Sequence, residues 1–566
     1  MMSKISSVRF HPAFRLYRYS VKRTMGLTVL MTVFLMLICP GYVFMHINHV
    51  LKLGSTDMKV YDLNRDLPTL ILIVTVITTA AAILYLFINF AFLYGRSSSD
   101  FFHSLPLNRR SLLASRFFAG IVPVLMPMTL TYAAMCGLLA IDYISGNIRL
   151  ILWGFVYNIL ILLMSCAFSM IFIVASGSVF DLIISFFTFN IGIAVVQLIN
   201  QSFCEVYLFG FPRGEIPAFF TNSSPFIYAF VTFSELMNGS ERTPADFVIF
   251  TARLLFVTAA SLVAAFLLYS RRKSEKSGVS YAYRFLYVVC ALIVGVIGAY
   301  ALGTIFAGDQ VTPVFWVFAV IGGMLAAVTF GAVNDRGFKS FKKSLVIGGC
   351  SAALIGTLAL FLWSGAFGYS SRIPEKESVK SVSVSFGQFS VEFDDPSLVI
   401  DLHKKITEQS GGDGYGEINI SYKLKFGELK RTYFVDYNDF SDELLKIIKS
   451  EENIENIRES FDAFTGNNLS LSFYYEDDWI DPVPITSSEL KGLKEAYVSD
   501  IPSATEDSVE GATRISCDIT GFDRNYDYCY YSVYIEEGFT NTIEYLESLD
   551  LKQRAVAYNT DTTVRE

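Results

Sequence analysis

Up to about residue 370, hydrophobic residues run in long stretches separated by short polar segments. A membrane-spanning helix needs roughly 20 consecutive, mostly apolar residues. Stretches of that length recur along this part of the chain and carry almost no charged residues. The pattern therefore predicts nine membrane spans, at 24–46, 69–95, 113–141, 149–176, 178–200, 246–270, 282–306, 312–334 and 344–366.

Beyond residue 370 the pattern changes to short segments in which apolar and polar residues alternate, as in half-buried strands. Residues 381–393 predict two short strands. Residues 418–435 predict a hairpin that turns at Gly427 and sets Tyr422 opposite Tyr433. This part of the chain therefore predicts an α+β domain. Its helices are predicted near 396–408, 441–463, 486–498 and 540–549.

A second hairpin is predicted at 512–536, with its turn at 521–525. In that register Cys517 lies directly opposite Cys529, and the spacing of directly opposed residues is close to that of a disulfide. An exported domain permits such a bond. Two free, buried thiols are the alternative interpretation.

Charge divides the chain at the same place as hydropathy. Residues 1–369 hold 26 Lys and Arg against 14 Asp and Glu, whereas residues 370–566 hold 19 against 39. The basic residues gather before the first span and in the loops after the second, sixth and eighth spans. With nine spans these segments share one side, which the positive-inside rule assigns to the cytoplasm. The acidic C-terminal domain is then extracellular.

Motifs for the common hydrolytic reactions are absent from the sequence. There is no GxxxxGK[ST] phosphate loop, no HExxH and no GxSxG. His46 and His49 have a spacing that suits a shared metal, but no third ligand clusters with them, which favours interfacial polar residues. The spans also lack the acidic pair that ion-coupled transporters need. No catalytic residue, cofactor, metal or nucleic-acid partner is expected, and the chain is not expected to be an enzyme.

The loop between the second and third spans, SSSDFFHSLPLNRRSLLASR at 97–116, is unusually apolar. Its serines and Asp100 are typical of a helix start, and Pro106 ends the helix. Phe101 and Phe102 stand between them. A short aromatic helix of this kind suits the groove of a partner protein. The alternative is an interfacial helix that lies on the membrane with its arginines at headgroup level.

The string DFFHSLPLNRRSLLASR resembles the first cytosolic loop of permease subunits of ATP-binding cassette (ABC) transporters, type-2 export class. That family also has an amphipathic elbow before the first span and short outer helices between the fifth and sixth, which residues 1–23 and 201–245 could supply. The resemblance implies that a separate ATPase subunit docks on loop 97–110. The coupling-helix residues would be Asp100, Phe101, Phe102, His103, Leu105, Pro106, Arg109 and Arg110.

The string ISYKLKFGELKRTYFVDY, which begins at Ile420, is similar to a hairpin in large permeases of Gram-positive bacteria that carry a C-terminal domain of unknown function. Tyr422, Leu424, Gly427, Arg431 or Lys430, and Tyr433 carry this match. With both resemblances the chain divides into an amphipathic cytosolic elbow at 1–23, a six-span permease-like unit at 24–275, a three-span extension at 276–369 and an extracellular acidic α+β domain at 370–566.

The expected fold is thus a mainly α-helical polytopic membrane protein with a C-terminal α+β domain. The expected function is that of an ABC permease in a bacterial cell membrane, exporting a peptide, a lipid-linked compound or an antibiotic. Its partners would be an ABC ATP-binding subunit, the lipid bilayer and a second permease, either identical or different. The alternative is a membrane sensor whose outer domain binds a ligand.

Overall fold

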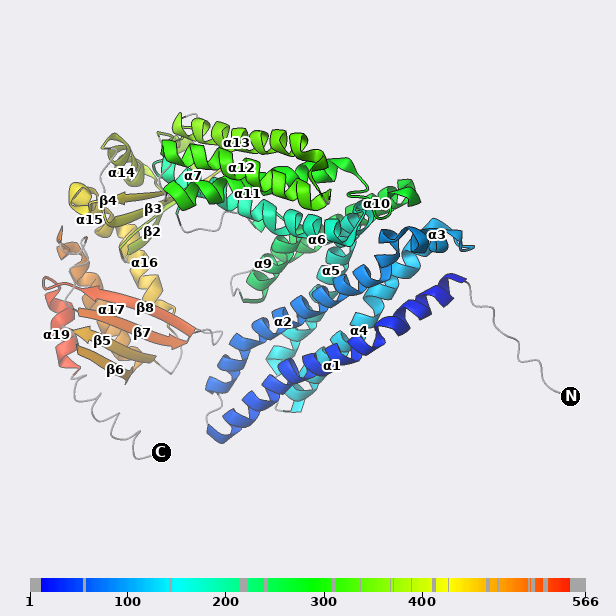
Figure 1. Ribbon diagram of the computed structural model, residues 1–566. Coiled ribbons are helices and arrows are strands. Elements are labelled where there is room, and N and C mark those ends of the chain that lie inside the picture. The colour runs from blue at the N-terminus through cyan, green and yellow to red at the C-terminus, as the bar shows by residue number, and fades with distance from the viewer. Residues whose placement is uncertain are drawn as a thin grey trace. The chain divides into compact units, whose positions relative to one another are not determined.

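The computed structural model of the chain divides into two compact units (Figure 1). The first comprises Met1–Ser202 and Ile216–Ala359, and the second comprises Phe203–Glu215 and Leu360–Glu566. The structure describes residues 12–549 except 54–56, 142–144, 214–220, 239–242, 308–311, 336, 367, 370, 388, 410–413, 426, 465–468, 476–477, 507–508, 510–514 and 523–527.

The first unit is helical, and the described part of the chain contains nine helical segments long and apolar enough to cross a membrane. The predicted number and order of the spans are therefore confirmed. The fifth segment is composite, because a π-helical turn at Thr188–Gly192 joins α6 to α7. The segments are α1 (Pro12–Leu53), α2 (Asp57–Phe90), α4 (Arg109–Ile141), α5 (Ser145–Ala175), α6 (Val179–Phe187) with α7 (Ile193–Tyr207), α10 (Pro244–Arg271), α11 (Arg284–Ala307), α12 (Pro313–Asn334) and α13 (Phe341–Trp363).

The N-terminal helix differs from the predicted elbow. Residues 12–23 form the first turns of α1 and continue into the first candidate span without a break. No proline or glycine lies between Pro12 and Gly26, so nothing in this sequence interrupts the backbone hydrogen bonds of the helix. Residues 1–11 of the predicted elbow lie outside the described residues.

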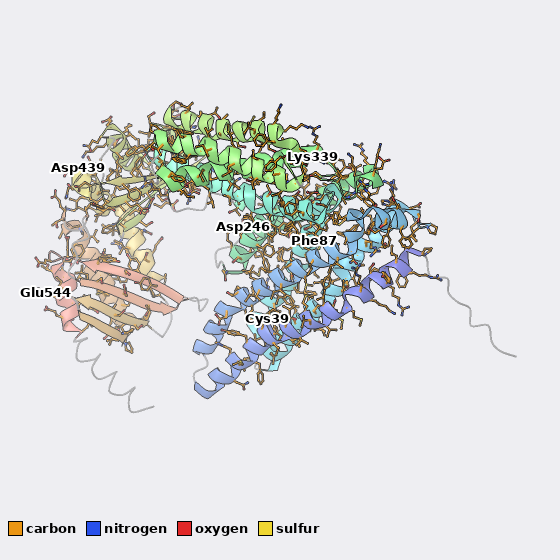
Figure 2. The ribbon with its side chains drawn as sticks, viewed as in Figure 1. Cys39, Phe87, Asp246, Lys339, Asp439 and Glu544 are labelled. Carbon is orange, nitrogen blue, oxygen red and sulfur yellow. The ribbon has the colours of Figure 1, made fainter. Side chains whose placement is uncertain are left out.

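The interior of the bundle is closely packed. Cys39 on α1 is fully buried (Figure 2), and its sulfur lies 3.9 Å from the carbonyl oxygen of Leu70 on α2. Phe87 on α2 meets Phe186 on α6 edge to face, with ring centroids 5.9 Å apart. The loop predicted at 201–245 holds one described short helix, α9 (Pro225–Asn238), which buries Phe233 in the same core.

Glycines allow α11, α12 and α13 to approach one another closely. A Cβ atom at Gly322 would lie 2.4 Å from the carbonyl oxygen of Gly298, and one at Gly348 would lie 2.6 Å from the Cα of Met324. Rows of small residues permit this backbone contact in membrane helices. The glycines in these three helices therefore serve packing within the chain.

The second unit contains two four-stranded antiparallel sheets among its described residues. Their strand orders are β2-β1-β3-β4 and β6-β5-β7-β8, so both sheets have the same topology. One hydrophobic core includes residues from both. The strands are β1 (Val379–Phe386), β2 (Phe389–Phe393), β3 (Gly416–Leu424), β4 (Glu428–Val435), β5 (Leu469–Tyr475), β6 (Asp478–Ile485), β7 (Ile515–Phe522) and β8 (Tyr528–Ile535).

The domain is thus an internal repeat of hairpin, helix, hairpin, helix. The helix between the hairpins is α14 (Ser397–Glu408) in the first half and α17 (Ser487–Asp500) in the second. In the first half the second hairpin is followed by two helices, α15 (Ser441–Ile448) and α16 (Glu451–Asp462). In the second half it is followed by one described helix, α19 (Thr540–Ser548). The sequence carries faint traces of the repeat: VSVSF in β1 against LSLSF in β5, and ISY in β3 against ISC in β7.

The hairpin of β3 and β4 exists, but its predicted register is wrong. Tyr433 pairs with Ile418 rather than with Tyr422, which pairs with Leu429. The cause is the turn. The backbone N–H of Leu424 donates to the carbonyl of Gly427, whose φ is +87°, so the loop lies before Gly427 instead of beginning there. Moving the turn two residues earlier in the chain displaces every pair by four positions.

The predicted opposition of Cys517 and Cys529 is also wrong. Cys517 pairs with Val533, and Cys529 pairs with Gly521. Cys529 lies four residues along β8 from the residue opposite Cys517. That is about 13 Å of strand, beyond the Cα separation a disulfide allows. Cys517 is a free, fully buried thiol. The predicted turn at 521–525 lies mostly outside the described residues.

The packing of α12 against α13 predicts opposite outcomes for two adjacent glycines. Gly348→Ala places a methyl group against the backbone of Met324 and should destabilise the helical unit by about 1–3 kcal/mol. Gly349→Ala is the matched control, since only the end of the Met324 side chain lies near its Cβ position. Thermal unfolding of the detergent-solubilised protein should show a lower midpoint for the first variant only. Equal midpoints would contradict the close contact.

Candidate functional site

A short helix, α3 (Arg96–Ser104), connects α2 to α4 through the predicted coupling loop. It begins at Arg96, one residue before the serines that predicted a helix start together with Asp100. Gly95 precedes it in an extended conformation, and the Ser98 hydroxyl donates to the Phe92 carbonyl, so Asp100 is not its N-cap. Leu105 is extended, as the residue before a proline usually is, and Pro106 ends the helix as predicted.

One face of α3 is held against the bundle by an arginine that contacts two adjoining aromatic rings. The guanidinium of Arg116 on α4 lies 4.6 Å from the ring centroid of Phe102 and 5.5 Å from that of Phe92. The two rings are themselves 4.7 Å apart. Arg116 is almost fully buried and donates to the hydroxyl of Ser20 on α1. These contacts fix α3 to α4 and α1.

The opposite face of α3 is open. The Phe101 side chain is 60% exposed, although it packs edge to face on Phe102. Asp100 on α3 is also exposed, as are Pro106 and Arg110 beyond its end, where the Arg110 guanidinium lies 5.2 Å from the ring centroid of Phe266 on α10. The predicted site residues thus divide into an anchored group and an outward-facing group. A large exposed aromatic residue on a rigid helix is the kind of feature that marks an interaction site.

A buried arginine, Arg272, joins two other segments beside α3. Its guanidinium donates to the carbonyl of Val174 at the end of α5 at 2.6 Å and to that of Leu93 at 2.8 Å. Arg109 in turn donates to the carbonyls of Ser270 and Arg272 at 3.0 Å each. Carbonyls at helix C-termini have no partner within the helix, and a cation satisfies them well.

Two further contacts complete this end of the bundle. Asp181 forms a capping box with Ser178 at the start of α6 and also accepts the backbone N–H of Tyr281 at 3.1 Å. The backbone N–H of Gly278 donates to the carbonyl of Gly177. The loops after α2, α5 and α10 are therefore bonded to one another at a single end of the helical unit.

His103 lies on the anchored side of α3. One ring nitrogen lies 3.4 Å from the hydroxyl of Tyr269 on α10. Burial, followed by the charges of Arg109 and Arg272, lowers the pKa of His103. The side chain is therefore neutral near pH 7. It packs between α3 and α10 and does not present a charge to a partner.

The residues of the hairpin string meet at a second place, within the C-terminal unit. His403 on α14 is fully buried between two tyrosines, with Nδ1 3.0 Å from the hydroxyl of Tyr422 and Nε2 2.6 Å from that of Tyr433. Burial and the charge of Arg431 lower the pKa of His403 to about 4. Both predicted tyrosines thus converge on one side chain, although they do not face each other.

Arg431 and Tyr433 also contact the two chain segments that follow α7 and α13. Arg431 is buried with its guanidinium 3.8 Å from the ring centroid of Tyr369, whose carbonyl it binds at 2.9 Å. Tyr433 packs against Phe209 at 5.0 Å. A Cβ atom at Gly210, whose φ is +78°, would lie 2.5 Å from the Tyr433 ring, so this position requires glycine.

Several of these residues were missed by sequence reasoning. Arg116 and Arg272 were counted only as loop charges, and His403 stood alone in the sequence. A signal existed for Arg116, since a charge that follows apolar residues into a span is usually paired. Nothing in the sequence points to the contact of Gly210 with β4, because the two segments lie far apart along the chain.

No group of three or more potential metal ligands occurs among the described residues. Comparison with models of protein families, with curated proteins and with solved structures finds no match.

Adjacent phenylalanines on α3 should behave differently. Phe102→Ala removes a ring that contacts Phe92 and Arg116 and should destabilise the helical unit by about 2 kcal/mol. Phe101→Ala removes a mostly exposed ring and should leave stability within about 0.5 kcal/mol. Thermal unfolding of the two purified variants separates them. A larger loss from Phe101→Ala would contradict the assignment of the two faces.

The buried histidine predicts a pH-dependent stability. Because the folded pKa of His403 is about 4, below the ordinary 6.5, the unfolded state takes up the proton first. Its contribution is therefore complete above pH 6.5 and is lost as the pH falls toward 4, by about 3 kcal/mol in total. Hydrogen exchange of β1–β4 should show this loss in the wild type. His403→Gln should reduce this pH dependence. An unchanged pH dependence in the variant would refute the assignment of the effect to His403.

Proposed function

We propose that this chain is the membrane-spanning permease subunit of an ABC transporter, and that α3 is the helix on which a separate ATPase subunit docks. The observation that carries the proposal is the division of α3 into two faces. Phe101 is presented outward, while Phe102 is fixed to α4. A docking helix must both contact a partner and pass its movement on to the spans.

The anchoring contacts suit the second of these tasks. A push on α3 acts directly on α2 and α4, to which it is joined by short connections. It also acts on α10, because Arg109 binds the carbonyls of Ser270 and Arg272 at the end of that helix. Movement of α3 against a nucleotide-driven partner would therefore displace three candidate spans together.

The chemistry of the chain fits a division of labour between subunits. The sequence lacks a phosphate-binding loop, so ATP hydrolysis would take place in the partner. The transport pathway would form with a second permease. Many large hydrophobic residues of the helical unit are exposed, such as Leu37 and Met45 on α1, and would face lipid or that second subunit. The substrate would be a peptide, a lipid-linked compound or an antibiotic.

The proposed orientation places α3 in the cytoplasm of a bacterial cell and the C-terminal domain outside. Its support is the charge of the loops bonded together near α3, which include Arg96, Arg109, Arg271 and Arg272. Basic loops remain on the cytoplasmic side of membranes. The acidic excess of residues 370–566 agrees with the opposite side.

A membrane sensor is the second candidate function. It is favoured by the contacts that the C-terminal domain makes with the chain segments that follow α7 and α13. Arg431 and Tyr433 hold Tyr369 and Phe209, which lie just beyond α13 and α7. A domain held this firmly can pass a change in its own shape to the two connecting segments. Such a protein would signal to a cytoplasmic partner instead of moving a substrate.

Affinity purification and measurement of ATP turnover distinguish the permease from the sensor. The tagged chain, purified from native membranes in mild detergent, should bring down a protein with an ABC nucleotide-binding domain. Phe101→Ala should reduce this recovery and the associated ATP turnover at least fivefold, because the exposed ring supplies a central contact. Phe338→Ala, which removes a 72% exposed ring from another loop, is the matched control and should change neither.

The docking proposal fails if no such ATPase is recovered with the wild type, or if both substitutions leave recovery and turnover unchanged. Recovery of a kinase or another signalling protein in its place would favour the sensor.

A further inference from the structure

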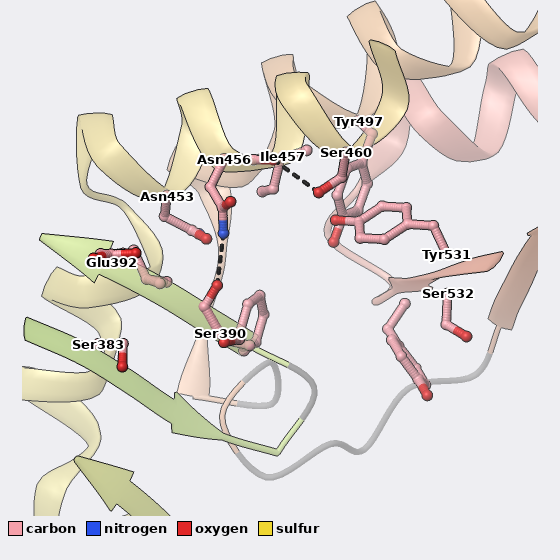
Figure 3. Close-up of a pocket in the computed structure, with 13 residues that line it drawn as sticks. Ser383, Ser390, Glu392, Asn453, Asn456, Ile457, Ser460, Tyr497, Tyr531 and Ser532 are labelled. Carbon is pink, nitrogen blue, oxygen red and sulfur yellow. Dashed lines mark hydrogen bonds between the residues drawn. The ribbon is translucent and has the colours of Figure 1, made fainter. Parts of the chain in front are cut away.

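A cavity of about 380 Å³ lies between the two halves of the C-terminal repeat. Edge strand β2 of the first sheet and edge strand β8 of the second sheet line it, and α16 passes along it (Figure 3). Its walls present hydroxyl and amide groups from different elements. The polar lining residues on β2, β8 and α16 include Ser390, Asn453, Asn456, Ser460 and Ser532.

The register of β1 and β2 leaves backbone groups of β2 turned toward this cavity. Phe386 pairs with Phe389 across a two-residue turn, which makes them a hydrogen-bonded pair. Hydrogen-bonded pairs alternate along the ladder, so Phe389, Val391 and Phe393 bond to β1. The N–H and C=O groups of Ser390 and Glu392 therefore point away from β1, into the space that a further strand would occupy.

A side-chain amide already occupies part of that position. The Nδ2 of Asn456 on α16 donates to the carbonyl oxygen of Ser390 at 2.6 Å (Figure 3). This amide N–H stands where the backbone N–H of an added strand would stand. The contact shows that the outward carbonyl of β2 accepts a hydrogen bond from an amide in this geometry.

The charge of the cavity favours an uncharged occupant. Glu392 is the one charged residue in its described lining. Lys423 and Ser381 both donate to Oε1 of Glu392 at 2.7 Å, and these hydrogen bonds lower its pKa. The carboxylate is already balanced by its partners. Neither an anionic nor a cationic ligand would find an unpaired opposite charge here.

The aromatic residues of the lining favour a peptide over a sugar. Sugar sites commonly offer an open aromatic face, but three of the four rings that line this cavity also pack on another ring. Tyr531 packs on Phe461 at 5.5 Å, and Tyr497 packs on Phe539 at 5.7 Å. Phe389 lies 5.6 Å from Phe386. What remains toward the cavity is mainly backbone, amide and hydroxyl groups.

We propose that this cavity binds a short, extended, uncharged peptide segment, which adds as a further strand to the edge of β2. The N–H of Ser390 and the N–H and C=O of Glu392 supply backbone donors and acceptors, and the peptide replaces Asn456 as the donor to the Ser390 carbonyl. The amides and hydroxyls of α16 and β8 recognise the far side of the peptide. At about 3.3 Å of rise per residue, a segment of roughly three residues reaches along the outward groups of β2. The site is independent of the α3 loop.

A matched pair of substitutions at one position tests the backbone contact. Ser390→Pro removes the outward N–H without removing a bond to β1, and proline is tolerated on an edge strand. Ser390→Ala keeps the N–H and removes only the hydroxyl. The full-length protein, immobilised in lipid nanodiscs, is exposed to an equimolar library of random heptapeptides with acetylated N-termini and amidated C-termini. Retained peptides are quantified by mass spectrometry.

The wild type and Ser390→Ala should retain a common set of uncharged peptides at least fivefold above Ser390→Pro. Ser460→Trp on α16 should also block retention, whereas Glu459→Trp, on the exposed side of the same helix, should not. Hydrogen exchange of β1 confirms that each variant is folded. Equal retention by all variants, or displacement of the peptides by chito-tetraose at equal concentration, would overturn the proposal.

Discussion

Guanidinium groups that bind backbone carbonyls hold together the end of the helical unit at which α3 lies. The last carbonyls of a helix have no hydrogen-bond donor within the helix. In a bundle of membrane-spanning helices, water cannot always supply the missing donor. Arg272 supplies partners for carbonyls at the ends of two helical segments at once, and Arg109 does so for α10. Because these bonds cross between segments, they satisfy the helix ends and also fix the loops to one another. The position of α3 depends on that framework.

Hydropathy was enough to predict the number and order of the candidate spans, because each span is a property of its own residues. Packing between spans could not be predicted in the same way. The role of Arg116 depends on Phe92, Phe102 and Ser20, which lie on three other segments. The sequence shows that each residue is present, but only the fold brings them together. For the same reason the exposed and anchored faces of α3 could not be told apart in advance.

In the C-terminal domain the sequence predicted strands and helices better than it predicted how they pair. The alternation that marks a strand repeats every two residues, so it is unchanged when the partner slides by four. The register of β3 and β4 is set by the position of the turn before Gly427. The pairing of β7 with β8 also differs from the prediction by four residues, so Cys517 does not lie opposite Cys529. The repeat was harder still to recognise. Its two halves share a pattern of small and aliphatic residues over a few positions, while the loops between them differ in length.

The segment Phe203–Glu215 belongs to the C-terminal unit, although it is separated from the rest of that unit by α9 to α12 and most of α13. The domain is therefore connected to the remainder of the chain on both sides of this segment as well as at Leu360. The segment is held within this unit by Phe209, which packs on Tyr433, and by Phe211, which packs on Tyr369. A break in the chain near Leu360 would therefore cut the covalent link between the two parts of this unit and leave these noncovalent contacts between them.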